Sequence, residues 1–201
     1  SRHAPRGTQV HDMTIDTAQT GVVLTDEDGA AALLETVNQA RAKGQPLVIQ
    51  GSCSKGFLAP SAAGLATIST RAHQGLISYR PEELVVTVRS GTPIDTLESA
   101  LAAAGQYLPF EPPRFGGGGT VGGLVAVGLS GPGRPWAGSV RDAILGVEMI
   151  NGLGERLRFG GQVMKNVAGF DLSRLQAGAF GTFGVLLSVS FKVLPRPVAE
   201  E

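Results

Sequence analysis

The chain has 201 residues, of which 42% are hydrophobic and 17% charged, a composition typical of a folded globular protein. The 17 basic and 17 acidic side chains give a net charge of zero, which argues against broad binding to nucleic acid or to an anionic membrane. A single cysteine and three histidines exclude an internal disulfide and a cysteine zinc site, and no apolar run is long enough to span a bilayer.

The first part of the chain is predicted to alternate strands and helices. Residues 1–19 are expected to be a polar lead-in that can include residues added in cloning. A helix is expected over 27–43, because its apolar residues have helical spacing, Asp26 can cap it and Gly44 can end it. The further elements expected here are strands over 21–25, 46–50, 65–69 and 84–89, and a helix over 93–104 with Thr92 as N-cap and Gly105 after its end.

The second part is richer in strands. A Pro- and Gly-rich stretch over 109–135 contains an apolar helix at 121–129, and Asn151-Gly152 predicts a hairpin. The other elements expected are strands over 143–150, 155–159 and 184–194, and a short helix over 172–176. The fold class is therefore α+β, with one subdomain over about 20–109, a second over about 110–197 and a tail over 198–201.

The 29 glycines gather in clusters without the strict three-residue repeat of collagen, which indicates that the backbone approaches a large ligand. The first cluster is the loop Gly51-Ser52-Cys53-Ser54-Lys55-Gly56, which directly follows an expected strand. Its small residues let backbone N–H groups converge, and two hydroxyls and an ammonium add donors, which suits a pyrophosphate. An ordinary polar loop fits equally well. The loop lacks the spacing of a Walker A motif.

A second cluster spans 116–123 and contains a Gly-x-Gly-x-x-Gly pattern at Gly117, Gly119 and Gly122. A dinucleotide-binding Rossmann loop must follow a central strand, and the preceding prolines exclude one. The remaining signal is Thr120-Val121-Gly122-Gly123, which opens the small-residue helix and can present amides to a phosphate. A third cluster over 178–184 fits either a tight turn or a backbone edge that faces a flat ring.

Five isolated side chains have both a chemical and a structural interpretation. Cys53 fits a small loop residue better than a reactive thiol, because no histidine lies near it in the sequence. His73 could carry a covalent flavin or act as a base, but a structural role is the safer expectation. Arg71, Arg80 and Arg141 could bind a carboxylate substrate, although surface arginines are common and nothing singles them out.

The order of these segments resembles the FAD-binding (PCMH-type) domain of the vanillyl-alcohol oxidase flavoprotein superfamily, and within it the FAD-binding subunits of bacterial glycolate oxidases. The resemblance covers about residues 25–197, which is the flavin domain without the C-terminal cap domain of this superfamily. The segments that carry the resemblance are 47–52, 69–73, Glu111-Pro112, 120–123, Ser130-Gly131, 135–142, 159–172, 181–185 and 194–197.

The resemblance implies that FAD is the cofactor, held between two α+β subdomains. The first loop and the segment 120–123 are expected to hold the pyrophosphate, four residues to line the ribityl and ring channel, and one residue to contact the adenine end through its backbone. The expected cofactor-binding residues are Gly51, Ser52, Cys53, Ser54, Lys55 and Gly56, then Thr120, Gly122 and Gly123, then Pro112, Ala126, Gly131 and Ser139 for the channel, and Val185 for the adenine end.

The expected activity is oxidation of a 2-hydroxy acid such as glycolate to a 2-oxo acid, with hydride transfer to the flavin. The expected partners are the other glycolate oxidase subunits, a second flavoprotein and an iron–sulfur protein, in the cytoplasm and held at the inner membrane only through those partners. The sequence offers no persuasive catalytic base, so the isolated chain is expected to be inactive or weak. Two alternatives are a non-catalytic FAD-binding module for electron transfer or assembly, and a nucleotide-binding protein of another class.

Overall fold

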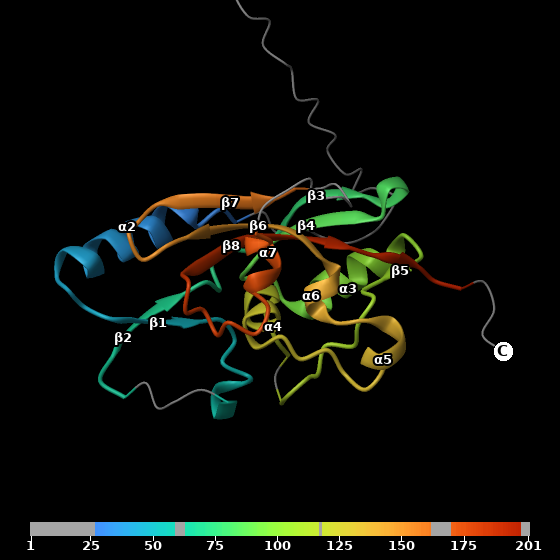
Figure 1. Cartoon of the computed structure of the whole chain (residues 1–201), viewed down its shortest axis with the longest axis horizontal. Coiled ribbons are helices and arrows are strands. Elements are labelled where there is room, and N and C mark those ends of the chain that lie inside the picture. Colours follow the sequence, from blue (N-terminus) through green and yellow to red (C-terminus); the bar gives the residue numbers. More distant parts are fainter. Residues whose placement is uncertain (1–26, 59–62, 117, 162–169, 198–201) are drawn as a thin grey trace, which may run out of the picture.

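The computed structural model describes residues 27–58, 63–116, 118–161 and 170–197 (Figure 1). The expected strand over 21–25 and Asp26 lie outside these residues. The helices are α2 (Ala30–Ala42), α3 (Ile94–Ala103), α4 (Val121–Val127), α5 (Arg134–Ala137), α6 (Val140–Ala143) and α7 (Leu172–Leu175), with short 3-10 turns at Gly56–Leu58 and Pro81–Glu83.

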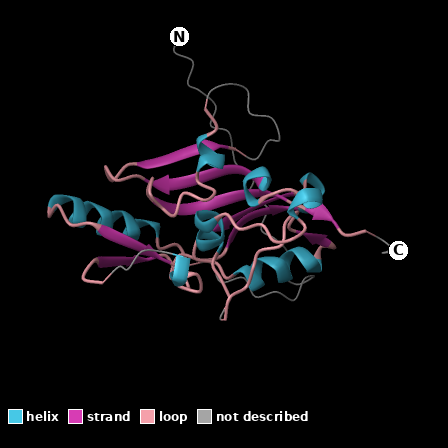
Figure 2. Cartoon of the chain, turned by 60° about the horizontal axis from the view of Figure 1, so that its bottom comes forward, coloured by secondary structure: helices cyan, strands magenta, loops and turns pink. Residues whose placement is uncertain are grey.

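A five-stranded antiparallel sheet is the centre of the fold. Its order is β3 (Leu76–Arg80), β4 (Val85–Arg89), β8 (Val185–Lys192), β6 (Ile144–Ile150) and β7 (Arg156–Gly160). A separate parallel pair joins β1 (Leu47–Gln50) to β2 (Ala66–Ser69), and β5 (Gln106–Tyr107) pairs with β9 (Leu194–Pro195). Figure 2 shows the larger sheet and the parallel pair as distinct groups of strands. Helices and sheets thus occur together as the α+β class requires.

Two apolar cores hold these layers together. In the larger core, α3 and α4 pack against one face of the five-stranded sheet, with Leu97 and Val125 fully buried against strand residues such as Phe191 (Figure 1). In the smaller core, Leu33 and Val37 of α2 pack with residues from β2, β6 and β8. The parallel pair β1–β2 is therefore fixed to one end of β6 and β8, which leaves the loop after β1 close to α4.

The expected boundary near residue 109 does not separate one sheet from another. The five-stranded sheet takes β3 and β4 from before this point and β6, β7 and β8 from after it. The two halves of the chain share this sheet because β8, which comes after residue 109, pairs with β4 on one side and with β6 on the other. A division of the chain by sequence at 109 does not match the arrangement of the strands.

Several local signals are confirmed. Gly44 and Gly105, expected after helix ends, have φ values of 60° and 66° and follow α2 and α3. The side chain of Thr120 accepts a hydrogen bond from the N–H of Gly123 and so caps α4. The hairpin at Asn151 also forms, although its loop is longer than a two-residue turn, because the Asn151 side chain accepts hydrogen bonds from the N–H groups of Leu153 and Glu155.

Other expectations were wrong. Thr92 does not cap α3, because its hydroxyl accepts a hydrogen bond of 2.9 Å from the N–H of Gly75 instead. Helix α2 begins at Ala30 rather than at 27, and the carboxylate of Asp28 accepts from the N–H of Ala30. Strand β3 was missed, since a register irregularity between Leu76 and Ser78 breaks the regular alternation that marks a strand.

Candidate cofactor-binding site

A cleft of about 340 Å³ lies between the loop after β1 and one side of α4. Its volume is at the lower end of the range typical of small-molecule sites. Nine of the fourteen residues expected from the sequence line it: Gly51, Ser52, Cys53, Ser54, Lys55, Gly56, Thr120, Gly123 and Ala126. The fold thus brings together the glycine-rich loop and the capped helix, which are separated along the chain.

The loop over 51–56 is held in a compact turn by its own contacts. The N–H of Gly56 donates to the carbonyl of Cys53 over 3.0 Å, and the Ser52 hydroxyl donates to the Ser54 hydroxyl over 3.3 Å. Cys53 has a φ of 58°, in the left-handed region that a non-glycine residue seldom adopts. Such a turn curls the chain so that backbone amides and two hydroxyls gather at the wall of the cleft.

Gly51 and Thr120 approach each other closely across the cleft floor. A Cβ atom on Gly51 would lie 2.2 Å from Oγ1 of Thr120 and a similar atom on Gly123 would lie 3.3 Å from it. Glycine is therefore required at Gly51 for the loop to reach the capped end of α4. The Thr120 side chain thus packs on the bare backbone of Gly51, and the glycine backbone of this part of the cleft fits a ligand that binds through backbone groups, as a pyrophosphate does.

Lys55 provides the positive charge of the cleft. Its Nζ atom lies near Gly119, the residue before Thr120, since a Cβ on Gly119 would be 3.1 Å from it. Within the part of the chain that the structure describes, Lys55 forms no ion pair. Burial lowers the pKa of the Lys55 ammonium from its ordinary value. A phosphate in the cleft would offset this cost by pairing with the ammonium.

The cleft continues into a small cavity of about 70 Å³. Gly122, also expected from the sequence, lines this cavity together with Thr70 and Ser90. Gly51, Gly123, Ala126 and Phe180 border both spaces. Ser90 was not expected from the sequence, because its position depends on contacts between segments that lie far apart along the chain. Phe180 belongs to the glycine cluster over 178–184, which was expected to form either a tight turn or a backbone edge facing a ring.

The remaining expected residues do not line the cleft. Pro112 lines a separate pocket beside Arg114, and Val185 lines a groove of about 260 Å³ between α2, β1 and the end of β6. Gly131 packs so closely on Glu111 that a Cβ would lie 2.4 Å from its carbonyl oxygen. Ser139 caps α6, where its hydroxyl and N–H both donate to the Asp142 carboxylate, which lowers the pKa of Asp142.

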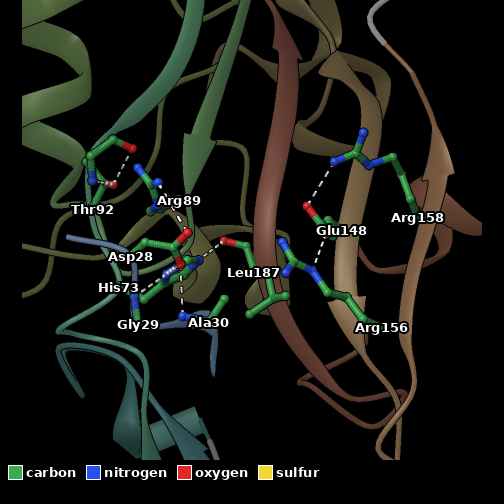
Figure 3. Close-up of polar contacts among 11 residues, drawn as sticks. Asp28, Gly29, Ala30, His73, Arg89, Thr92, Glu148, Arg156, Arg158 and Leu187 are labelled. Atoms are coloured by element: carbon green, nitrogen blue, oxygen red, sulfur yellow. Dashed lines mark hydrogen bonds and ion pairs between the residues drawn. The ribbon is translucent and has the colours of Figure 1, made fainter. Parts of the chain in front are cut away.

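His73 has a structural role in the fold. Its Nδ1 atom accepts from the N–H of Gly29 over 3.0 Å, so Nε2 donates to the carbonyl of Leu187 over 3.0 Å (Figure 3). The ring is 4% exposed, and burial lowers its pKa while the nearby Asp28 carboxylate opposes that change. Since backbone groups occupy both ring nitrogens, His73 is neither placed nor available to hold a flavin or move a proton in the cleft.

The three arginines considered as substrate ligands lie outside the cleft lining. Arg80 pairs with Glu83 at the surface, and the side chains of Arg71 and Arg141 are exposed. Among the described residues there is no group of three or more His, Cys, Asp or Glu side chains arranged to hold a metal ion. No helix in that same part of the chain has both the length and the apolar character needed to cross a membrane.

The fold is that of a flavin-binding domain. Residues 17–160 match the FAD binding domain family, and the chain belongs to that family. The chain is 57% identical over 177 residues to glycolate oxidase subunit GlcE of Escherichia coli (strain K12), an alignment that covers 88% of this chain and 50% of that protein. It is 30% identical to glycolate oxidase subunit GlcD of Bacillus subtilis (strain 168), covering 76% of this chain and 32% of the relative.

A solved structure of alkyldihydroxyacetonephosphate synthase has the same fold. It matches with a TM-score of 0.71 and 22% sequence identity over 86% of this chain and 31% of that one. The expected α+β flavin-binding fold and the expected FAD cofactor are thus confirmed. The chain spans about half the length of GlcE and about a third of GlcD, so these relatives contain much that this chain does not.

Proposed function

We propose that the cleft between the loop over 51–56 and α4 holds the pyrophosphate of FAD. The observation that carries this proposal is the close approach of Gly51 to Thr120, which brings the glycine-rich loop to the capped end of α4 beside the ammonium of Lys55. In this arrangement backbone amides and the hydroxyls of Ser52 and Ser54 donate to phosphate oxygens, and Lys55 balances their charge. Bound FAD would supply the hydride acceptor, and the chain would position it and exclude water from one side.

The remaining contacts stay predictions. Pro112, Ala126, Gly131 and Ser139 are proposed to line the ribityl and ring channel, and Val185 to meet the adenine end. The groove beside Val185 supports the last of these, because it shares Ile49 of β1 with the cleft and with the small cavity. Substitution of each of these residues in turn, followed by measurement of FAD affinity, would test each placement.

The proposed activity is that of an FAD-dependent oxidoreductase subunit which oxidises a 2-hydroxy acid such as glycolate to a 2-oxo acid. The support is the 57% identity to a glycolate oxidase subunit. The proposed partners are a second flavoprotein subunit and an iron–sulfur subunit of the same complex. A cytoplasmic location, with attachment to the inner membrane only through those partners, also stays a prediction.

The direct test starts with the colour of the purified chain. We expect a yellow protein that releases FAD on denaturation, or a colourless one that FAD stabilises against heat. Glycolate added to the chain alone should reduce its flavin slowly or not at all, and reduction should become fast when the partner subunits are added. A chain that neither contains nor binds FAD would refute the proposal.

A second candidate function is a non-catalytic FAD-binding module for electron transfer or assembly. It uses the same FAD site as the first function but needs no base beside the flavin ring. The two functions differ in stopped-flow reduction of the assembled complex. If glycolate reduces the flavin of this chain only after the flavin of the partner is reduced, the chain acts as a relay, and direct reduction would indicate a substrate site.

A further inference from the structure

Ser90 follows β4 at the place where the five-stranded sheet meets α4. The residue is fully buried, with 0% of its surface exposed. Its backbone is satisfied on both sides, since its N–H donates to Leu187 over 2.8 Å and its carbonyl accepts from the N–H of Gly122 over 2.7 Å. Its hydroxyl, in contrast, makes no hydrogen bond within the part of the chain that the structure describes.

An unpartnered buried hydroxyl is unusual, because the loss of its hydration is not compensated. Ser90 lines the small cavity of about 70 Å³ that adjoins the cleft, and this cavity is bordered largely by glycine backbone, including Gly122 and Gly184. The cavity is far smaller than a typical site for a ring system. Its size and its single spare donor suit a compact oxygen-rich group.

We propose that the Ser90 hydroxyl donates a hydrogen bond to an oxygen of the ligand's diphosphate, which enters the small cavity from the cleft. This inference rests on the proposed FAD site and adds a phosphate ligand from β4 to those of the loop and α4. Three arguments support it. The hydroxyl can donate, the space adjoins Gly51 and Gly123 beside the proposed phosphate site, and a diphosphate oxygen is a strong acceptor.

The test compares two buried serines of the same sheet in the full chain. Ser90→Ala removes the unpartnered hydroxyl, whereas Ser190→Ala removes a hydroxyl that lies 2.8 Å from Oγ1 of Thr87 and is outside the cleft lining. We expect Ser90→Ala to weaken binding of both FAD and ADP about tenfold, since both carry a diphosphate, and to leave the melting temperature of the ligand-free chain unchanged or higher. Ser190→Ala should lower that melting temperature and leave both affinities unchanged.

Several results would overturn the inference. An unchanged affinity for FAD and ADP in Ser90→Ala would show that the hydroxyl does not contact the ligand, and a lowered melting temperature of the free variant would indicate an ordered water or a protein partner. A loss for FAD without a loss for ADP would place the contact elsewhere on the cofactor. If Ser90→Ala fails to fold, Ser90→Cys replaces it, because the thiol is of similar size and a weaker donor. This variant should also bind FAD and ADP more weakly, and unchanged affinities would overturn the inference.

These outcomes are separate from failure of the proposed function. If the unaltered chain binds FAD but Ser90→Ala binds it equally well, only the role of Ser90 is refuted. If the unaltered chain binds neither FAD nor ADP, both the cofactor site and the role of Ser90 are refuted together.

Discussion

The N–H of Gly29 donates a hydrogen bond to Nδ1 of His73 over 3.0 Å, and this contact fixes the start of α2 to the turn after β2 (Figure 3). Because Nδ1 is an acceptor, the ring is neutral and carries its proton on Nε2, which donates to Leu187 of β8. The His73 ring therefore connects the start of α2 and the turn after β2 to the five-stranded sheet.

This contact predicts that stability falls at mildly acidic pH. Burial lowers the pKa of His73 from 6.5 in the folded chain, so the unfolded chain takes up the proton first as the pH falls. Stability is then fully present above about pH 6.5 and is lost as the pH falls from there to the folded pKa, by about 1.4 kcal/mol for each unit of pKa lowering. Urea unfolding between pH 5 and pH 8 measures this. His73→Asn should flatten the dependence, and an equal slope in both proteins would contradict it.

A second prediction concerns the close approach of Gly51 to Thr120. Gly51→Ala places a Cβ atom 2.2 Å from Oγ1 of Thr120, so the cap of α4 must shift. We expect a loss of about 1 kcal/mol in unfolding free energy from the disturbed cap and a roughly tenfold weaker binding of FAD. Gly56→Ala is the matched control for stability in the same loop, since nothing lies within 4 Å of its Cβ, and it should leave the free energy of unfolding unchanged. Equal behaviour of the two variants would argue against the close approach.

A third prediction tests the charge in the cleft. Lys55→Met should weaken ADP binding about tenfold at low salt and less at high salt, because the ammonium pairs with phosphate in a partly buried site. In the unaltered chain the phosphate should raise the lowered pKa of Lys55. Affinity for ADP is then full below the pKa of the free chain and declines as the pH rises from that value to the pKa of the complex. Isothermal titration calorimetry at several pH values measures this decline.

The control for that experiment is Lys43→Met. Lys43 is exposed just after α2 and lies outside the cleft lining, so its loss should leave the pH dependence of ADP binding intact. If Lys55→Met keeps the same pH dependence as the unaltered chain, another group titrates and the ammonium does not contact the phosphate.

Local signals predicted much of the site. A strand that ends in a glycine-rich loop and a threonine before a small-residue helix each depend on neighbouring residues alone, so the loop over 51–56 and the Thr120 cap were predictable. Tertiary contacts determined the rest. Thr92 has a good capping position, but Gly75 offers its hydroxyl a partner from another segment. Ser90 lines the small cavity beside the cleft only because Gly122 and Leu187 fix it between β8 and α4.

The residues expected for the ring channel show the limit of a family resemblance. Their order in the chain matches the family, yet Gly131 and Ser139 are used in tight packing and in the cap of α6. A motif identifies which segments surround a ligand, whereas the contacts of each side chain depend on the packing beside it. This is why nine expected residues meet at one cleft and Gly122 lines the cavity beside it, whereas the other four lie apart.

The last prediction uses the backbone of Cys53. Its φ of 58° lies in a region that costs an L side chain about 1–2 kcal/mol and is least favourable for a β-branched one, whereas glycine and asparagine adopt it readily. We expect Cys53→Val to lower the free energy of unfolding and to weaken FAD binding, because the loop must open to relieve the added strain. Cys53→Gly and Cys53→Asn should keep FAD affinity within about twofold of the unaltered chain, roughly 0.4 kcal/mol. Fluorescence titration and urea unfolding give both quantities. Since the last two variants remove the thiol, a large loss of affinity in both would instead assign Cys53 a direct role in binding.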